Sequence, residues 1–144
     1  MDADRGVRDL VARICDAVAR ADVDAWVACW RDDGEWVFPG REPIVGVHQL
    51  RAAFAPLRAK LDLCVPEVLS GWVDGTGDTA TARWYLRETQ RSADGGHEVM
   101  GCYDDRVVRD EYGWRFARRR FWVLYRGPRD LDGEVFRPPP PAAP

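Results

Sequence analysis

The segment ATARWYLRETQR at residues 80–91 places a carboxylate in line with bulky apolar side chains. Alternate side chains of a β-strand face the same side, so Glu88 is expected to share a side with Trp84 and Leu86. Apolar neighbours desolvate a carboxylate and raise its pKa toward neutrality. Such a group can give or take a proton near neutral pH. In the alternative interpretation, Glu88 lies at the open end of the sheet, solvated or paired with an arginine.

Two later segments carry further groups that could transfer a proton or hold a charged ligand. Tyr103 and Asp105 are two residues apart, so they share a face of their strand. Arg118 and Arg120 share a face in the same way, whereas the arginine between them points to the opposite side. We expect Arg118 or Arg120 to pair with the strand carboxylate, or with a carboxylate or enolate of a substrate.

Histidine and cysteine offer little additional chemistry. His97 follows a DGG turn and is expected at a rim or on the surface, and His48 begins a predicted helix. The cysteines, at positions 15, 29, 64 and 102, show no CxxC spacing and lie in apolar segments. We interpret them as buried small side chains in a reducing cytoplasm. No metal site and no cofactor is expected.

Length and composition indicate one globular domain: the chain has 144 residues, of which 46% are hydrophobic and 31% charged. The net charge of −3 gives no general attraction to nucleic acid or to anionic membranes. The segment MDADRGVRDL has no apolar region of a secretory signal, and no apolar run reaches transmembrane length. We therefore expect a cytoplasmic protein that binds neither nucleic acid nor membranes.

Three helices are predicted in the first part of the chain. Helical spacing of apolar residues predicts the first over residues 5–20. Asp22 is the expected N-cap of a second, short helix, and a short strand follows at 35–38. A third helix contains Leu50 and Phe54, and Pro56 is expected to end or kink it.

The rest of the chain to residue 126 is predicted to form strands separated by short Gly/Asp turns. The expected strands span 61–73 (one strand, or two pieces split near Pro66), 79–91, 97–109 and 114–126. Helices followed by such strands indicate an α+β fold with an antiparallel sheet. Three helices cannot cover a strongly curled sheet, so an apolar pocket is expected. Residues 127–144 are predicted to be an irregular extension with a Pro-rich tail.

Three motifs in this order resemble the SnoaL-like branch of the NTF2-like superfamily. They are DAWVACWRDDGEW at 24–36, GDTATARWYLRE at 77–88 and GCYDDRVVRDEYGWRFARR at 101–119, and the resemblance spans residues 6–126. It implies a cone-shaped roll of three N-terminal helices against a curved, mostly antiparallel sheet with an internal pocket. It also implies a homodimer packed through the outer face of the sheet. By the resemblance, Glu88 is the acid that points into the cavity.

The sequence departs from the dehydratases of this family at the residues that perform their chemistry. Ile14 and Ala19 stand where those enzymes carry a tyrosine and an aspartate, and Phe38 stands where a tyrosine is frequent. The family histidine falls at Cys64 or Val65. The His–Asp dyad of elimination is therefore absent, although the fold also hosts cyclases, isomerases, epoxide hydrolases and non-catalytic modules.

These observations predict a pocket that is apolar and aromatic with one or two acids. Its expected catalytic residues are Glu88, Tyr103 and Asp105, and its expected substrate-binding residues are Ile14, Trp26, Trp30, Phe38, Phe54, Cys64, Trp84, Met100, Arg118 and Arg120. The preferred interpretation is a cofactor-independent cyclase that folds a hydrophobic, polyketide-like or polycyclic molecule into a reactive conformer. A dehydratase or isomerase, or a non-catalytic binding or dimeric scaffold module, remains the alternative. Trp30 and Trp84 are expected to be buried.

Overall fold

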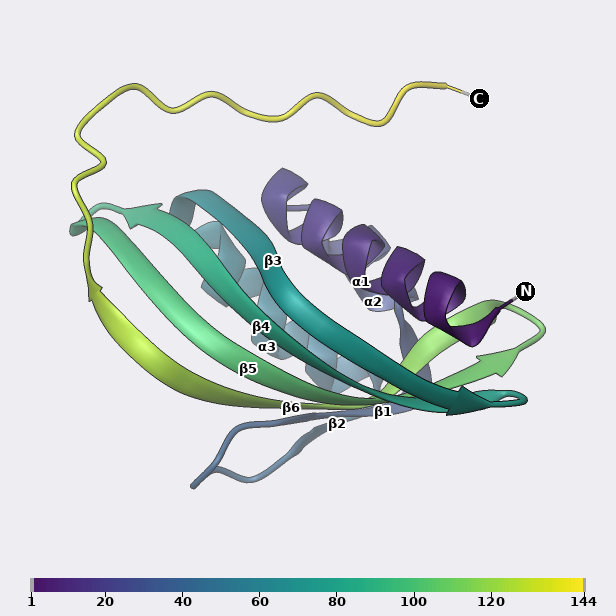
Figure 1. The fold of residues 1–144 in the computed structure, drawn as a ribbon. Helices are drawn as coiled ribbons and strands as arrows, with labels where there is room; N and C mark the ends of the chain where they lie inside the picture. The colour runs from purple at the N-terminus through teal and green to yellow at the C-terminus, as the bar shows by residue number, and fades with distance from the viewer. Residues whose placement is uncertain (1, 144) are drawn as a thin grey trace.

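A computed structural model describes residues 2–143. The elements follow in the order α1 (Ala3–Arg20), α2 (Val23–Ala28), β1 (Trp30–Val37), β2 (Ile44–Val45), α3 (Val47–Ala59), β3 (Leu61–Thr76), β4 (Thr79–Ser92), β5 (Gly95–Asp110) and β6 (Gly113–Pro128). The helices lie against the concave side of one strongly curved sheet (Figure 1). The expected α+β roll with three N-terminal helices is confirmed.

The sheet has six strands in the order β2-β1-β6-β5-β4-β3. Its pairs are antiparallel except β1 with β6, which run parallel. The long strands β3 to β6 follow one another through short turns and form the curved wall as a meander. The last of them, β6, pairs with β1. This wall positions most strand residues of the site described below, and β1 adds Trp36.

The first two helices begin at aspartate caps. Asp2 accepts a hydrogen bond from the backbone N–H of Asp4, and Asp22 accepts one from the N–H of Ala25 at 2.9 Å, as predicted for the second helix. Ala21 takes a left-handed conformation at the end of α1 and turns the chain toward α2. The apolar stripe of α1 faces the sheet.

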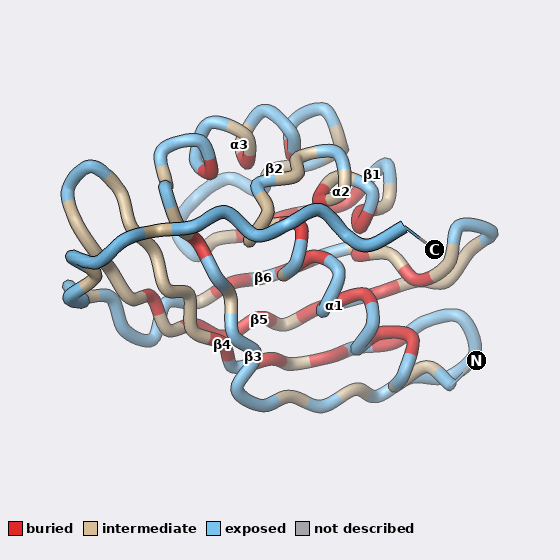
Figure 2. The backbone as a smooth tube through the Cα atoms, turned by 90° about the horizontal axis from the view of Figure 1, so that it is seen from above, coloured by how far each residue is buried: buried red, intermediate tan, exposed pale blue. Residues whose placement is uncertain are grey.

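The core lies between the helices and the inner face of the sheet (Figure 2). Trp30 and Trp84 are 1% and 2% exposed, which confirms their predicted burial. Trp30 packs against the rings of Trp26, Trp36 and Phe116, with ring centres 5.4 to 6.3 Å apart. The aromatic cluster joins α2, β1 and β6, so it fixes one end of the space between helices and sheet.

The structure corrects the predicted end of α3 and the predicted start of β1, and it decides between the two alternatives for the strand at 61–73 in favour of one strand. Pro56 does not end α3, which continues to Ala59, because buried Leu50, Phe54 and Arg58 hold the helix on the sheet across the one hydrogen bond that proline cannot make. Leu61–Thr76 is one strand across Pro66, which is tolerated because β3 is an edge strand. β1 also begins earlier than expected, at Trp30.

The described chain after Pro128 has no helix or strand. It leaves the end of β6 and crosses back over the helix side of the molecule (Figure 1). The Arg91 side chain donates to the backbone carbonyl oxygens of Leu131 and Gly133 and holds the start of this extension. Within residues 2–143, no helix is long and apolar enough to cross a membrane.

Candidate functional site

A cavity of about 770 Å³ lies between α1, α3 and the concave face of the sheet. Its lining is mostly apolar and aromatic, and its size falls in the range of small-molecule sites. The aromatic lining residues are Trp26, Trp36, Phe38, Phe54, Trp84, Tyr103 and Phe121. Trp26 and Phe54 stack with ring centres 4.2 Å apart and form a flat apolar wall. A cavity of this size and lining can accommodate a small apolar molecule.

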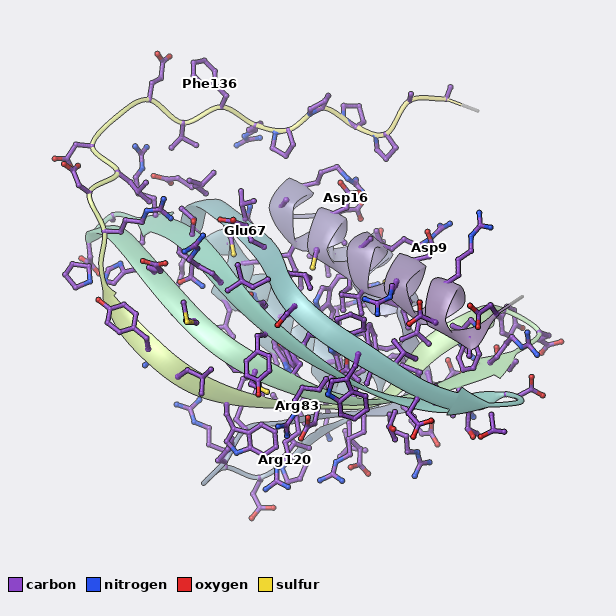
Figure 3. All side chains as sticks on the ribbon, viewed as in Figure 1. Asp9, Asp16, Glu67, Arg83, Arg120 and Phe136 are labelled. Atoms are coloured by element: carbon purple, nitrogen blue, oxygen red, sulfur yellow. The ribbon has the colours of Figure 1, made fainter. Side chains whose placement is uncertain are left out.

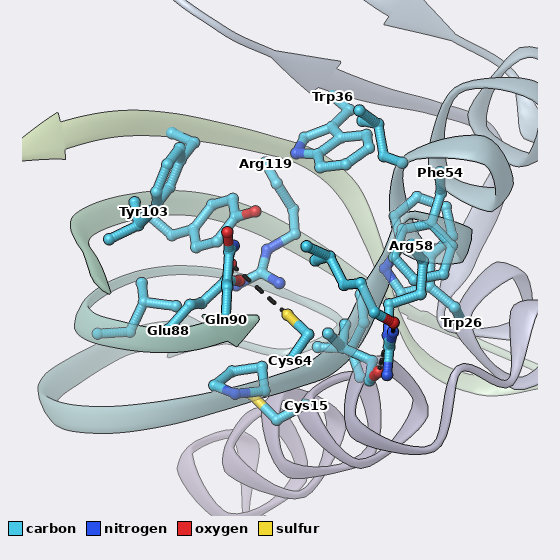
Figure 4. Close-up of a pocket in the computed structure, with 18 of the residues that line it drawn as sticks. Cys15, Trp26, Trp36, Phe54, Arg58, Cys64, Glu88, Gln90, Tyr103 and Arg119 are labelled. Carbon is cyan, nitrogen blue, oxygen red and sulfur yellow. Dashed lines mark hydrogen bonds between the residues drawn. The ribbon is translucent and has the colours of Figure 1, made fainter. Parts of the chain in front are cut away.

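Glu88 lines this cavity beside Trp84 and Leu86, as the alternation of β4 predicts. The side chain of Gln90 donates to Oε2 of Glu88 at 2.8 Å, and the Cys64 sulfur lies 4.0 Å from the same oxygen (Figure 4). Burial raises the pKa of Glu88 above its usual range, although Gln90 and the charges of Arg119 and Arg58 oppose the rise. Because Gln90 occupies one carboxyl oxygen, Oε1 is the oxygen left for a ligand.

A buried ion pair lies deeper in the wall, between β5 and β6. Arg119 donates through Nε and Nη2 to the two carboxylate oxygens of Asp105, at 2.8 and 3.1 Å. Its guanidinium carbon lies 3.7 Å from the ring centre of Tyr103 and 4.2 Å from that of Phe116. Arg119 and Tyr103 line the cavity, whereas Asp105 lies behind Arg119 and does not. Asp105 thus supports Arg119 and does not contact a ligand.

Arg118 and Arg120 are exposed, which corrects the expected face of this strand. Arg106 pairs with Arg118 but Val107 pairs with Phe116, so Ala117 is an extra residue in β6. Such a bulge reverses the alternation that follows it. Arg120 consequently points away from the helices, toward the outer face of the sheet (Figure 3).

The other expected wall residues divide into two groups. Those that line the cavity are Ile14, Trp26, Phe38, Phe54, Cys64 and Trp84. Trp30 does not, because Trp26, Trp36 and Phe116 enclose it in the core. Met100 does not line the cavity either. Val99 and Tyr103 show that odd-numbered residues in this part of β5 face inward, so Met100 belongs to the opposite face of the sheet. Of the two positions considered for the family histidine, Cys64 faces the cavity and Val65 is exposed.

The lining residues missed from the sequence include four aromatic or polar ones that bear on the chemistry of the site. Trp36 and Gln90 follow the expected alternation with Phe38 and Glu88, so strand parity could have found both. Arg119 could have been assigned to the lining only if the bulge at Ala117 had been known. Arg58 is buried where α3 ends, and its three nitrogens donate to the backbone carbonyl oxygens of Val18, Ala19 and Leu61. The sequence gave no sign that Arg58 would be buried, because a single arginine in an apolar helix is ordinarily a surface residue.

The cysteines and histidines add no reactive centre to the cavity. Cys15 and Cys64 line it, and burial raises the pKa of both thiols, which favours the protonated form. Neither His48 nor His97 lines it among the residues described. In residues 2–143 no three His, Cys, Asp or Glu side chains are grouped to hold a metal ion. Glu88 is therefore the acid–base candidate with the best-placed carboxyl.

Comparisons with known proteins agree with this architecture. A family model for the SnoaL-like domain matches residues 1–120. A search of curated proteins found no match.

Solved structures with the same roll include proteins of several described activities. A putative aromatic ring hydroxylase from Novosphingobium aromaticivorans is 28% identical, with a TM-score of 0.76 over 84% of this chain and 88% of the other. A putative scytalone dehydratase from the same organism is 15% identical, with a TM-score of 0.80 over 92% and 89%. A hexachlorocyclohexane dehydrochlorinase from Novosphingobium barchaimii is 17% identical, with a TM-score of 0.73 over 94% of each chain. The last two show the fold alone.

Proposed function

The chain belongs to the SnoaL-like domain family, and we propose that it is an enzyme that moves a proton on a hydrophobic small molecule without a cofactor. The observation that carries the proposal is the position of Glu88, a carboxyl among apolar walls with one oxygen that has no hydrogen-bond partner among residues 2–143. The other acidic lining residue, Asp94, lies exposed in the turn between β4 and β5. A desolvated carboxyl can act as acid or base near neutral pH.

The surroundings of Glu88 support separate roles for the carboxyl itself, for Gln90 and for the aromatic wall. When protonated, Glu88 can donate through Oε1 to a carbonyl or hydroxyl oxygen of the ligand, and when ionised it can take a proton from an adjacent carbon. The amide of Gln90 fixes the carboxyl by holding Oε2. Trp26, Phe54 and Trp84 offer flat surfaces that orient the apolar body and exclude water.

Within this class, we propose cyclisation or isomerisation of a polyketide-like or polycyclic molecule. Holding a flexible chain in a reactive conformer supplies about 7–11 kcal/mol of a barrier, and a large aromatic cavity suits that task. Elimination of water or chloride, suggested by the fold neighbours, is the second candidate. Protonated Glu88 could assist a leaving hydroxyl, but the described lining offers no histidine as the partner base.

The test is the substitution Glu88→Gln, assayed on polycyclic and polyketide-like carbonyl compounds. Glutamine keeps the shape and the contact with Gln90 but cannot transfer the proton, so turnover is expected to fall by about 10²–10⁴ while the fold is retained. The matched control is Glu67→Gln, an exposed glutamate on β3 outside the cavity. If turnover is unchanged in Glu88→Gln, proton transfer by Glu88 is excluded and cavity shape must account for catalysis. If wild-type protein binds the compounds but converts none, a binding module is the better description.

A further inference from the structure

The cavity is more basic than the protein around it. Its basic lining residues are Arg58, Lys60, Arg119 and Arg126, whereas its acidic ones are Glu88 and Asp94. The whole chain nevertheless has a net charge of −3. Arg58 and Arg119 are also buried, at 7% and 5% exposure. Buried cations are costly unless they are paired or hydrogen-bonded, so the partners of each guanidinium show which of its donors is left for a ligand.

Arg119 presents an unused donor to the cavity. Its Nε and Nη2 are held by Asp105. Among the described residues, Nη1 has no hydrogen-bond partner, and it is not one of the fully enclosed polar atoms. The aromatic rings of Tyr103 and Phe116 keep the guanidinium plane in place. The nitrogen left over is therefore rigidly held and open to a ligand.

Arg58 adds a second charge to the same region. Its nitrogens donate only to backbone carbonyl oxygens, at 2.7 to 3.2 Å, and no carboxylate in the described chain forms an ion pair with it. Two of those carbonyls lie at the end of α1, where the helix dipole compensates only part of the charge. Both arginines line the same cavity (Figure 4), and their charges favour the ionised form of Glu88.

We infer that the ligand of this cavity is an aromatic or polycyclic anion whose negatively charged oxygen group binds Nη1 of Arg119. Tyr103 lines the cavity with its ring 3.7 Å from the guanidinium carbon of Arg119, so its hydroxyl can donate to the same group, and Arg58 supplies the longer-range attraction. The apolar body then lies against the stacked rings of Trp26 and Phe54. This inference rests on the proposed function in one respect: it names the substrate class of the same cavity.

Two fluorescent probes of nearly the same shape test the inference. Anilinonaphthalene sulfonate carries an anionic oxygen group, and phenylnaphthylamine is its neutral parent. A charge-assisted hydrogen bond in a desolvated site should make the wild-type protein bind the sulfonate about 10-fold to 100-fold more tightly than the parent. The informative variant is Arg119→Met with Asp105→Leu, which removes both charges together and leaves no buried carboxylate unpaired. The matched control is Arg120→Met, the next arginine of β6, which is exposed.

The double variant should lose most of the preference for the sulfonate, keeping only the weaker attraction of Arg58, whereas the Arg120→Met control should keep the wild-type preference. Equal binding of the two probes by wild-type protein overturns the inference, as does an undiminished preference in the double variant or failure of both probes to bind. A double variant that does not fold is replaced by Tyr103→Phe, which should weaken the sulfonate selectively. None of these results depends on turnover. Loss of activity in Glu88→Gln with equal probe binding would retain the proposed function and reject the anionic substrate.

Discussion

At the scale of single residues, the ion pair of Asp105 and Arg119 is the interaction most sensitive to substitution. Asp105→Asn leaves a buried guanidinium without its counter-charge and should lower the free energy of unfolding by about 3–5 kcal/mol. The double replacement Arg119→Met with Asp105→Leu should restore most of this loss, because no uncompensated charge remains. Urea unfolding measures both. The control is Asp104→Asn, which breaks a half-exposed pair with Arg83 and should cost at most about 1 kcal/mol. Equal losses in the two single variants would contradict the prediction.

The pKa of Glu88 predicts a pH dependence of stability. Burial raises this pKa in the folded protein, so the folded state binds the proton more tightly than the unfolded chain does. The contribution of Glu88 is therefore fully present below the ordinary glutamate pKa and is lost as pH rises through the raised value. Relative to Glu88→Gln, wild-type protein should become less stable as pH rises above about 4, the ordinary glutamate pKa, until the pH passes the raised value. Urea unfolding across this range measures the difference, and parallel pH profiles of the two proteins would contradict it.

At the scale of elements, apolar periodicity predicted the three helices and the four long strands. It also predicted the side of β4 that carries Trp84 and Glu88, because no irregularity interrupts the pairing of β4 with β5. The extra residue Ala117 in β6 could not be predicted, since a bulge arises from the pairing of two strands. That one residue decided which arginine of the run at 118–120 faces the cavity.

The close approach of β5 and β6 gives a second prediction at this scale. A side-chain carbon on Gly101 would collide with the ring of Phe121, which lines the cavity and packs 4.7 Å from Tyr103. Gly101→Ala should therefore lower the free energy of unfolding by about 1–3 kcal/mol through overpacking. It should also weaken probe binding, because the ring of Phe121 has to move. The control Gly133→Ala, at a position with no neighbouring atom within 4 Å, should change neither. Unchanged urea unfolding of Gly101→Ala would contradict the prediction.

At the scale of the whole molecule, the sheet has a second face that its helices do not cover. Trp72, Tyr85 and Tyr125 are 38% to 52% exposed. They belong to cross-strand rows on the side opposite to the cavity, where the labelled side chains of Arg83 and Arg120 also point (Figure 3). Large exposed aromatic residues on one surface indicate an interaction site.

We propose that this outer face pairs two copies of the chain, as the family resemblance implied. Arg83 and Asp104 neutralise each other within the face, so two identical faces can meet without burying an unpaired charge. Sedimentation should give about twice the 16.4 kDa of one chain.

The variant Trp72→Arg tests this pairing. It places a positive charge on each of the two facing surfaces, so it should produce monomers. These monomers should still bind the fluorescent probes, since the cavity opens on the other side of the sheet. Tyr112→Arg is the control: this tyrosine is 74% exposed in the turn between β5 and β6, and its replacement should leave the dimer intact. A wild-type protein that sediments as a monomer at high concentration would exclude the pairing and require another partner for the aromatic surface.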